Sequence, residues 1–318
     1  MRRGDLRREL RRVDLATEGS LPASLEAAID VDGGLWEAGD YYTDPAEIVD
    51  AALRVGAVAL RLDVRDLSLL EQLPDVRYLH VRSDGRPVLD PIAGLRGLRA
   101  LLLDTSALRG ELDPLAFPEL RWLRVGLGGK GGARVLPSIV RGHAALEWLA
   151  LRETRARSVE ELVGAFPSLR RISIHFADYI ARLGHLGATT PRLTGINLWL
   201  TQLASLDGIE ALPELEMLSV VGGQVRDLSP VAAARRLRYA RLLVPRTDSI
   251  EPLAGHPALR MLELGIGRQP STAVLDSIPG LVAVGRGRGF EGPISQADLF
   301  ELPRDDPLRI EWVRESRA

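Results

Sequence analysis

Aliphatic residues recur along this chain in one short phrase. The phrase reads apolar residue or histidine, often proline, any residue, leucine, usually arginine, any residue, leucine, any residue, and leucine or valine. Clear copies occupy residues 73–81, 117–125, 166–174, 212–220 and 256–264. The Leu-x-Leu ending alternates apolar and solvent-facing positions, which predicts a short strand with one buried face.

The central apolar position of the phrase repeats at a nearly constant spacing, most often 22 residues. It falls at Leu79, Leu101, Leu123, Leu149, Ile172, Ile196, Leu218, Ala240, Leu262 and Val284. A fixed period predicts stacked coils whose strands lie side by side, about 4.8 Å apart, in a parallel sheet. Each coil buries its apolar side chains only against its neighbours, so a single coil is not expected to fold alone. A weaker copy at residues 57–64 brings the expected array to about ten or eleven coils.

This pattern resembles the leucine-rich-repeat family over about residues 44–289, and its 22-residue coils resemble the short-repeat, internalin-like subtype. The resemblance implies an α/β solenoid with a curved parallel β-sheet on the concave face and mixed short helices and turns on the convex face. The sequence departs from the family at the position that usually holds asparagine. That position holds Ser106, Gly128, Thr154, Ala177, Thr201 and Gly223.

We expect three regions: an N-terminal arm and cap over residues 1–43, the repeat array over 44–288 and a C-terminal cap segment over 289–318. Asp44 is a suitable N-cap for a helix that continues to Val55 and stops at Gly56. Residues 308–313 alternate like a strand that covers the last coil.

The basic N-terminal segment, residues 1–13, has Leu6, Leu10 and Val13 on one face of a predicted helix. Its arginines suit a basic arm for nucleic acid or anionic lipid. A capping helix is the favoured alternative, because Asp5 and Glu9 interrupt the positive charge.

The composition is that of a folded protein, with 318 residues, 46% hydrophobic and 26% charged residues and a formal net charge of -2. The chain has no cysteine, which excludes disulfides, thiolate metal sites and cysteine nucleophiles. We find neither a secretory signal nor an apolar run long enough to span a bilayer, so the expected location is the cytoplasm.

Polar and aromatic residues between the buried positions of each strand face outward, and they predict the binding surface. Trp, Tyr, Met and Arg gathered on one face are typical of binding hot spots. The candidate partner-binding residues are Tyr78, His80, Trp122, Arg124, Trp148, Arg152, Arg171, His175, Trp199, Met217, Tyr239, Arg241 and Met261. Alternatively, each ring stacks on its strand neighbours and only stabilises the sheet. For the whole set, binding is the favoured interpretation.

A second column of side chains lies one residue earlier in the phrase. It contains Arg77, Arg99, Arg121, Arg170, Arg238 and Arg260. Such a stripe suits an acidic protein or a phosphate backbone. Solvated arginines along the rim of the sheet are the favoured alternative, and an isoelectric point of about 6.3 argues against a dedicated nucleic-acid binder.

Other motifs give no support for catalysis. The segment 126–132 contains the only lysine, Lys130, but Arg124 and Gly131 occupy positions where a phosphate-binding loop needs Gly and Ser or Thr, so we interpret it as a loop insertion. His143 and His256 hold equivalent repeat positions and are expected to be structural. We expect no metal, no cofactor and no catalytic residue.

The function that the sequence favours is therefore a non-catalytic protein–protein interaction module, which binds an unidentified protein or peptide on the concave face. Nucleic-acid or other polyanion binding through the arginine stripe and the basic arm is the alternative. The pattern predicts neither the partner's identity nor the oligomeric state.

Overall fold

The structure is a computed structural model, and the chain divides into two compact units. The described elements up to residue 127 belong to the first unit, and those from residue 144 onward belong to the second. The residues that the structure describes are 10–13, 21–38, 44–83, 85, 87–105, 113, 116–127, 143–152, 154, 156–163, 166–176, 178–267, 271–281 and 283–286.

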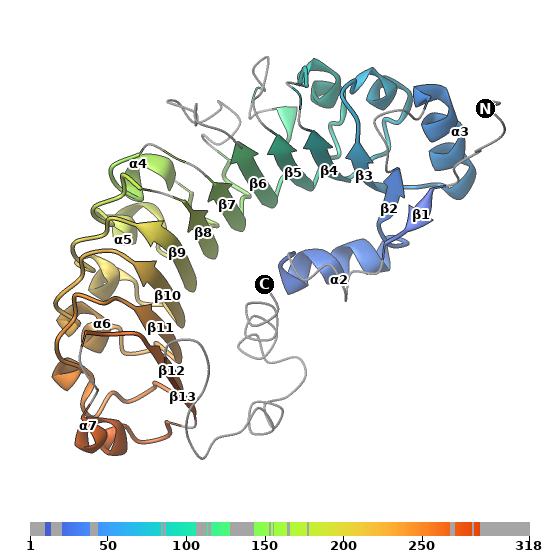
Figure 1. Ribbon diagram of the computed structural model, residues 1–318. Coiled ribbons are helices and arrows are strands. Elements are labelled where there is room, and N and C mark those ends of the chain that lie inside the picture. The colour runs from blue at the N-terminus through green and yellow to red at the C-terminus, as the bar shows by residue number, and fades with distance from the viewer. Residues whose placement is uncertain are drawn as a thin grey trace, which may run out of the picture. The chain divides into compact units, whose positions relative to one another are not determined.

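The first unit contains a sheet in which each strand pairs with the next along the chain (Figure 1). Its strands are β1 (Arg11–Arg12), β2 (Trp36–Ala38), β3 (Ala59–Asp63), β4 (Tyr78–Ser83), β5 (Ala100–Thr105) and β6 (Trp122–Leu127). Strands β2 to β6 run parallel, and Leu79, Leu101 and Leu123 lie in register. The predicted ladder of apolar positions is confirmed here.

Short helices join these strands on one face of the sheet. They are α3 (Pro45–Val55), η1 (Ser68–Gln72) and η2 (Asp90–Gly94). The side chain of Asp44 accepts a hydrogen bond from the Ala46 amide at 2.9 Å, and Gly56 ends α3 in the left-handed conformation, with φ of 64°. The helix predicted from Asp44 to Gly56 is therefore confirmed, and its capping is the chemical reason for its bounds.

The second unit repeats the same arrangement in parallel strands throughout. Its strands are β7 (Trp148–Arg152), β8 (Arg171–His175), β9 (Gly195–Thr201), β10 (Met217–Gly222), β11 (Tyr239–Leu243), β12 (Met261–Leu264) and β13 (Ala283–Arg286). The connecting helices are α4 (Glu160–Val163), α5 (Leu186–Thr189), η5 (Ile209–Ala211), α6 (Ser229–Ala233), η6 (Glu251–Leu253) and α7 (Thr272–Ser277). The mixture of single turns and short helices agrees with the expectation for the convex face.

The core of each unit is formed by the apolar positions of the phrase, which lie between the sheet and the short helices. The first position of the phrase is buried whatever residue fills it: Phe117 and Phe166 are completely enclosed, and His143 and His256 are buried in the same role. The structural interpretation of these two histidines is confirmed. Burial of one such aliphatic side chain contributes roughly 1.5–3 kcal/mol, so the stack of coils stabilises itself through repetition.

The N-terminal segment differs from the prediction. Within residues 10–13 the chain forms strand β1 rather than a helix, and β1 pairs antiparallel with β2. An uncovered sheet edge offers unpaired amide and carbonyl groups, and β1 satisfies those of β2. The parallel sheet also begins at β2, ahead of the predicted array start at residue 44. Residues 1–9, the glycine-rich segment 128–132 and the predicted strand at 308–313 lie outside the described residues.

Candidate functional site

The predicted binding positions lie on the open face of each sheet, which we define as the face opposite the short connecting helices. In the first unit, Tyr78 of β4 and Trp122 of β6 share one level of the sheet. In the second unit, the candidates that share one level are Trp148, Arg171, Met217, Tyr239 and Met261. The predicted columns are therefore confirmed as positions in the sheet.

Helix α2 (Ala23–Val31) crosses the open face of the first unit (Figure 1). At its first turn, Trp122 Nε1 of β6 donates a hydrogen bond to Ser24 Oγ at 3.2 Å. Just after its last turn, Asp32 Oδ2 accepts a hydrogen bond from the hydroxyl of Tyr78 in β4 at 3.0 Å. Eight helical residues rise about 12 Å, which is enough to cross two strand spacings of about 4.8 Å.

The underside of α2 is apolar. Leu21, Leu25 and Ile29 are spaced by four residues, share one face and are buried. Leu102, which occupies an open-face position of β5, is buried as well. The open face of the first unit therefore has a hydrophobic contact with a helix of the same chain, and polar contacts mark both ends of that helix.

This helix corrects the expected exposure of three candidates. Tyr78 and Trp122 keep only 3% and 6% of their surface, and His80 is buried too, because α2 and its flanking residues cover the face that the strands present. The apolar spacing at Leu21, Leu25 and Ile29 was the signal that could have predicted α2. Nothing in that spacing indicated where the helix would dock.

Two members of the arginine stripe face the same helix end. The Nη1 atoms of Arg77 and Arg99 lie 3.7 and 3.8 Å from Asp32 Oδ2, and Arg99 Nε lies 3.2 Å from Glu119 Oε2. In the first unit these arginines therefore pair with nearby acids, as the rim interpretation expects.

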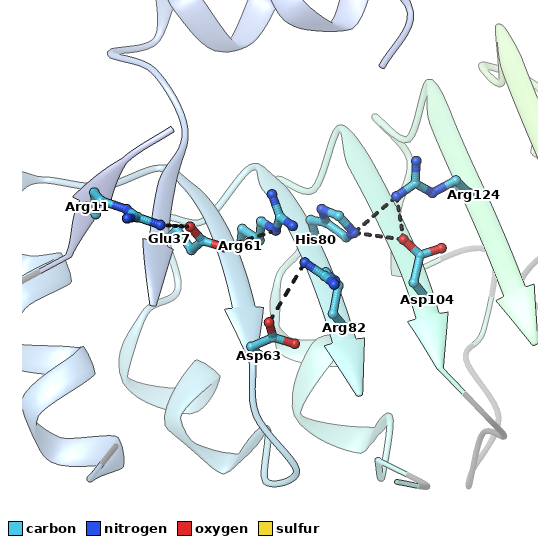
Figure 2. Close-up of polar contacts among 8 residues, drawn as sticks. All are labelled: Arg11, Glu37, Arg61, Asp63, His80, Arg82, Asp104 and Arg124. Atoms are coloured by element: carbon cyan, nitrogen blue, oxygen red, sulfur yellow. Dashed lines mark hydrogen bonds and ion pairs between the residues drawn. The ribbon is translucent and has the colours of Figure 1, made fainter. Parts of the chain in front are cut away.

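A chain of charged side chains continues along the next level of the open face in the first unit (Figure 2). Glu37 of β2 pairs with Arg11 at 3.2 Å and with Arg61 at 3.4 Å. At the other end of the chain, Asp104 Oδ2 lies 2.9 Å from His80 Nε2 and also contacts the guanidinium of Arg124. The structure thus brings together two of the predicted candidates, His80 and Arg124, through a carboxylate that the sequence analysis did not select.

The electrostatics of this cluster favour a neutral histidine and an ionised carboxylate. Burial lowers the pKa of His80, and the charge of Arg124 lowers it further, although Asp104 acts in the opposite direction. Burial alone would raise the pKa of Asp104, but the hydrogen bond from His80 and the charge of Arg124 outweigh it and lower that pKa to about 2. Neutral His80 therefore donates its Nε2 hydrogen to Asp104.

Three candidates in the second unit are also less exposed than expected. Met217, Tyr239 and Met261 are buried. They occupy the same level of three consecutive strands, so they shield one another laterally, which accounts for part of their burial. One level further along, Arg241 Nε lies 3.1 Å from Glu263 Oε2. For these residues the alternative of lateral stacking describes the structure better than an exposed hot spot.

The remaining candidates keep access to solvent. Trp148, Arg171, His175 and Trp199 are half-buried, and Arg152 is exposed. His175 and Trp199 are paired in register on β8 and β9, and their rings meet edge to face with centroids 5.3 Å apart. The open face of β7 to β9 is therefore the part of the second unit where predicted candidates are both clustered and accessible.

Hydrogen bonds hold His175 in place. The amide of Asn197 donates to Ser173 Oγ at 3.1 Å and to His175 Nε2 at 3.3 Å, and Ser173 Oγ lies 3.0 Å from the same nitrogen. Because Nε2 accepts these contacts, its lone pair is already engaged, and the Ser173–His175 pair is better suited to positioning a ring than to general-base chemistry.

Two exposed aromatic residues beside this cluster were missed. Phe176 follows β8, keeps 40% of its surface exposed and lies under the guanidinium of Arg152, whose Cζ is 5.1 Å from the ring centroid. Tyr179, in the turn that follows, is 58% exposed. Neither fits the repeat phrase, so the periodicity that selected the other candidates could not select them.

We searched the described residues for other kinds of site. Among them, no group of three or more His, Asp or Glu side chains has an arrangement that could hold a metal ion. Within the same residues, no helix combines the length and the apolar character that a membrane crossing needs.

In-register parallel strands, 22-residue coils and short connecting helices define a leucine-rich-repeat fold. The structure is similar to that of an internalin (inlF) from Listeria monocytogenes, with 17% identity, a TM-score of 0.58 and coverage of 83% of this chain and 76% of that one. It is also similar to TLR13 in its complex with ssRNA13, with 13% identity, a TM-score of 0.57 and coverage of 79% of this chain and 40% of that one. No protein-family model and no curated protein sequence matches the chain.

Proposed function

We propose that this chain is a non-catalytic protein–protein interaction module that binds its partner on the open face of its parallel sheet. In the second unit, the accessible part of that face lies over β7 to β9 and includes Trp148, Arg171, His175 and Trp199. Large rigid rings beside arginine give contact area at a low entropic cost, as in the hot spots of known interfaces.

The observation that carries the proposal is the contact between α2 and the open face of the first unit. There, Tyr78 and Trp122 already contact a polypeptide helix through an apolar surface and two terminal hydrogen bonds. Trp148 occupies the first open-face position of its strand, as Trp122 does in β6. The same kind of side chain at the same kind of position supports polypeptide binding in the second unit.

A second candidate function is nucleic-acid binding through the arginine stripe. The observation that favours it is the exposure of Arg170 and Arg260, two stripe members in the second unit. TLR13, in the similar structure, is in complex with ssRNA13. If a labelled single strand binds, its affinity is expected to fall steeply as salt rises, and an affinity that is insensitive to salt would exclude this candidate.

Capture of the partner from a native lysate, followed by mass spectrometry, tests the main proposal. The full chain is immobilised, and the affinity of the recovered protein is then measured for Trp148→Ala and Trp199→Ala. We expect each variant to weaken binding by about tenfold or more. Leu53→Ala, at an exposed position of α3, is the control and should bind normally. Undiminished binding by both tryptophan variants would contradict the proposal.

A further inference from the structure

The backbone of Phe176 is held in a conformation that phenylalanine rarely adopts. Its φ is 56°, and among the described residues it is the one non-glycine residue with positive φ. The left-handed region is costly for a bulky side chain and suits glycine. Its amide donates to the carbonyl of Trp199 at 3.0 Å, so the neighbouring coil holds this conformation in place.

An equivalent position in the same sheet contains the residue that this conformation favours. His175 is in register with Trp199, and Trp199 is in register with Val221, so Phe176 corresponds to Gly222. Gly222 also has positive φ, 87°. The fold therefore accepts glycine at this turn, and a phenylalanine here costs stability that the ring does not recover through burial, since 40% of it is exposed.

The ring of Phe176 is part of a cluster at the C-terminal ends of β7 to β9, which we call the edge patch: Arg152, His175, Phe176, Tyr179 and Trp199. Arg152 lies over the Phe176 ring and has no acidic partner among the described residues. A guanidinium stacked on a ring keeps its N–H groups available at its edge, where they suit a carboxylate.

Charge around the edge patch is mainly positive. Besides Arg152, the loops that follow β7 and β8 expose Arg157 and Arg182, and Asp178 is the one exposed carboxylate described in the loop after β8. These two loops lie together, because the amide of Ala181 donates to the carbonyl of Arg157 at 3.0 Å. The surface therefore complements a negatively charged partner.

The cationic groups are confined to two coils, which favours a short acidic peptide over a nucleic-acid backbone. In the next coils the position of Trp199 holds Val221 and Leu243, neither of which is charged. A phosphate backbone needs positive groups along its length, and the chain as a whole carries a net charge of -2.

We propose that the edge patch is a docking site for an acidic peptide segment of a partner protein, with Phe176 and Tyr179 as apolar anchors and Arg152 as the carboxylate-binding group. This inference rests on the proposed function and names the part of the surface and the partner chemistry that it uses. The unfavourable backbone of Phe176 is then the cost of presenting its ring to the partner.

Selection of random peptides displayed on phage, with the full chain as bait, tests this inference. We expect the selected peptides to be enriched in Asp and Glu beside an aromatic or aliphatic residue. The peptides are then synthesised with a fluorescent label and titrated by anisotropy. Phe176→Gly and Arg152→Gln should each weaken binding by about 30-fold, the effect of losing a hot-spot residue. Leu53→Ala serves as the unaffected control.

Phe176→Gly also has an expected effect on stability that separates docking from structure. Because glycine suits the left-handed backbone, its melting temperature should equal or exceed that of the parent. If Phe176→Gly fails to fold, the proposed presentation of the ring is wrong. Arg152→Gln and Tyr179→Ala then still test the acidic-peptide site.

The outcomes separate this inference from the proposed function. Peptides without acidic enrichment, or acidic peptides that bind the three edge-patch variants normally, would overturn the edge patch. If Trp148→Ala weakens binding of the lysate partner in that case, the open-face proposal survives by itself. A labelled oligo-dT strand that binds more tightly than the acidic peptides and depends on Phe176 would also overturn the inference, in favour of single-strand binding.

Discussion

The indole of Trp122 donates its hydrogen bond to the hydroxyl of Ser24 across 98 residues of sequence. This contact places an N-terminal helix on the sheet face that the repeat pattern predicts to be free. The side chains that a partner would need in the first unit are therefore already used within the chain. In the second unit, solvent access over β7 to β9 is the feature that supports binding there.

Replacement of Leu25 by Ala is expected to release α2 from the first unit. Leu25 is completely buried, so the substitution should cost about 2–3 kcal/mol of the contact between α2 and the sheet. Hydrogen exchange followed by mass spectrometry should show faster exchange in residues 23–31 and unchanged protection in β10 to β12. Val31→Ala is the matched control on the same helix, since Val31 is 85% exposed. Equal protection of α2 in the Leu25 variant and the parent would contradict the assigned packing.

Replacement of Asp104 by Asn is expected to change stability against acid. The pKa of Asp104 is about 2 in the folded chain and 3.8 in the reference state, so the unfolded chain binds more protons between these values. The stabilisation from this carboxylate is therefore present above pH 3.8 and is lost as the pH falls toward 2, to an upper limit of about 2 kcal/mol. Urea titrations at several pH values measure it. Asp104→Asn should lower stability at pH 7 and flatten the acid slope. An unchanged slope would contradict the His80–Asp104–Arg124 geometry.

His256 is expected to remain neutral in a single tautomer. Its Nδ1 accepts from the Leu259 amide at 3.1 Å, so Nε2 carries the hydrogen and donates to the Ala234 carbonyl at 3.2 Å. Burial lowers its pKa from 6.5, and stability from this residue is complete above that pH and is lost as the pH falls through the lowered folded value. Nitrogen NMR shifts of the ring should identify the Nε2–H form at pH 7.

The variant His256→Leu separates the two contributions of that histidine. Leucine fits the position by size, because Leu73 and Leu212 begin the same phrase in other coils, but it leaves the Ala234 carbonyl and the Leu259 amide without their partner. We expect a loss of about 1–3 kcal/mol at pH 7. We also expect a weaker fall in stability below pH 6.5 than in the parent, measured by thermal melts. A parent-like fall would contradict the assignment.

Glycine 208 is expected to tolerate no side chain, because two coils approach closely there. A Cβ atom on Gly208 would lie 2.6 Å from the carbonyl oxygen of Gly184, and its φ is 103°. Gly255 also has positive φ, 67°, but has open space around it. Gly255→Ala should therefore cost about 1 kcal/mol, and Gly208→Ala more than about 3 kcal/mol because the backbones must also separate. Denaturant midpoints compare the two, and equal losses would show that the coils are not in contact at this point.

The repeat spacing was sufficient to predict the strands, their order and their register. Leu79, Leu101 and Leu123 lie side by side because each coil has one set of apolar residues and only its neighbours against which to bury them. The helix that begins after Asp44 was equally accessible, since its capping residues are contiguous in the sequence. Strand β1 was missed because pairing at a sheet edge, and not local helical periodicity, decides the conformation of Arg11 and Arg12.

The candidate site was predicted by position and only partly by exposure. Alternation along a strand determines which face Trp122 and Trp148 share, because that choice is local. Whether such a face is open depends on segments far away in the sequence, such as α2 over Trp122. The left-handed turn at Phe176 likewise depends on the adjacent coil, whose Trp199 carbonyl accepts its amide hydrogen.

Short-range regularity therefore dictates the coil, the stacking of the strands and the face on which each side chain lies, because burial with a constant period has one solution. The tertiary structure alone decided which open-face residues meet solvent. The helix across β4 to β6 and the rings at the ends of β7 to β9 result from contacts between distant segments, whose free energies no repeat spacing encodes.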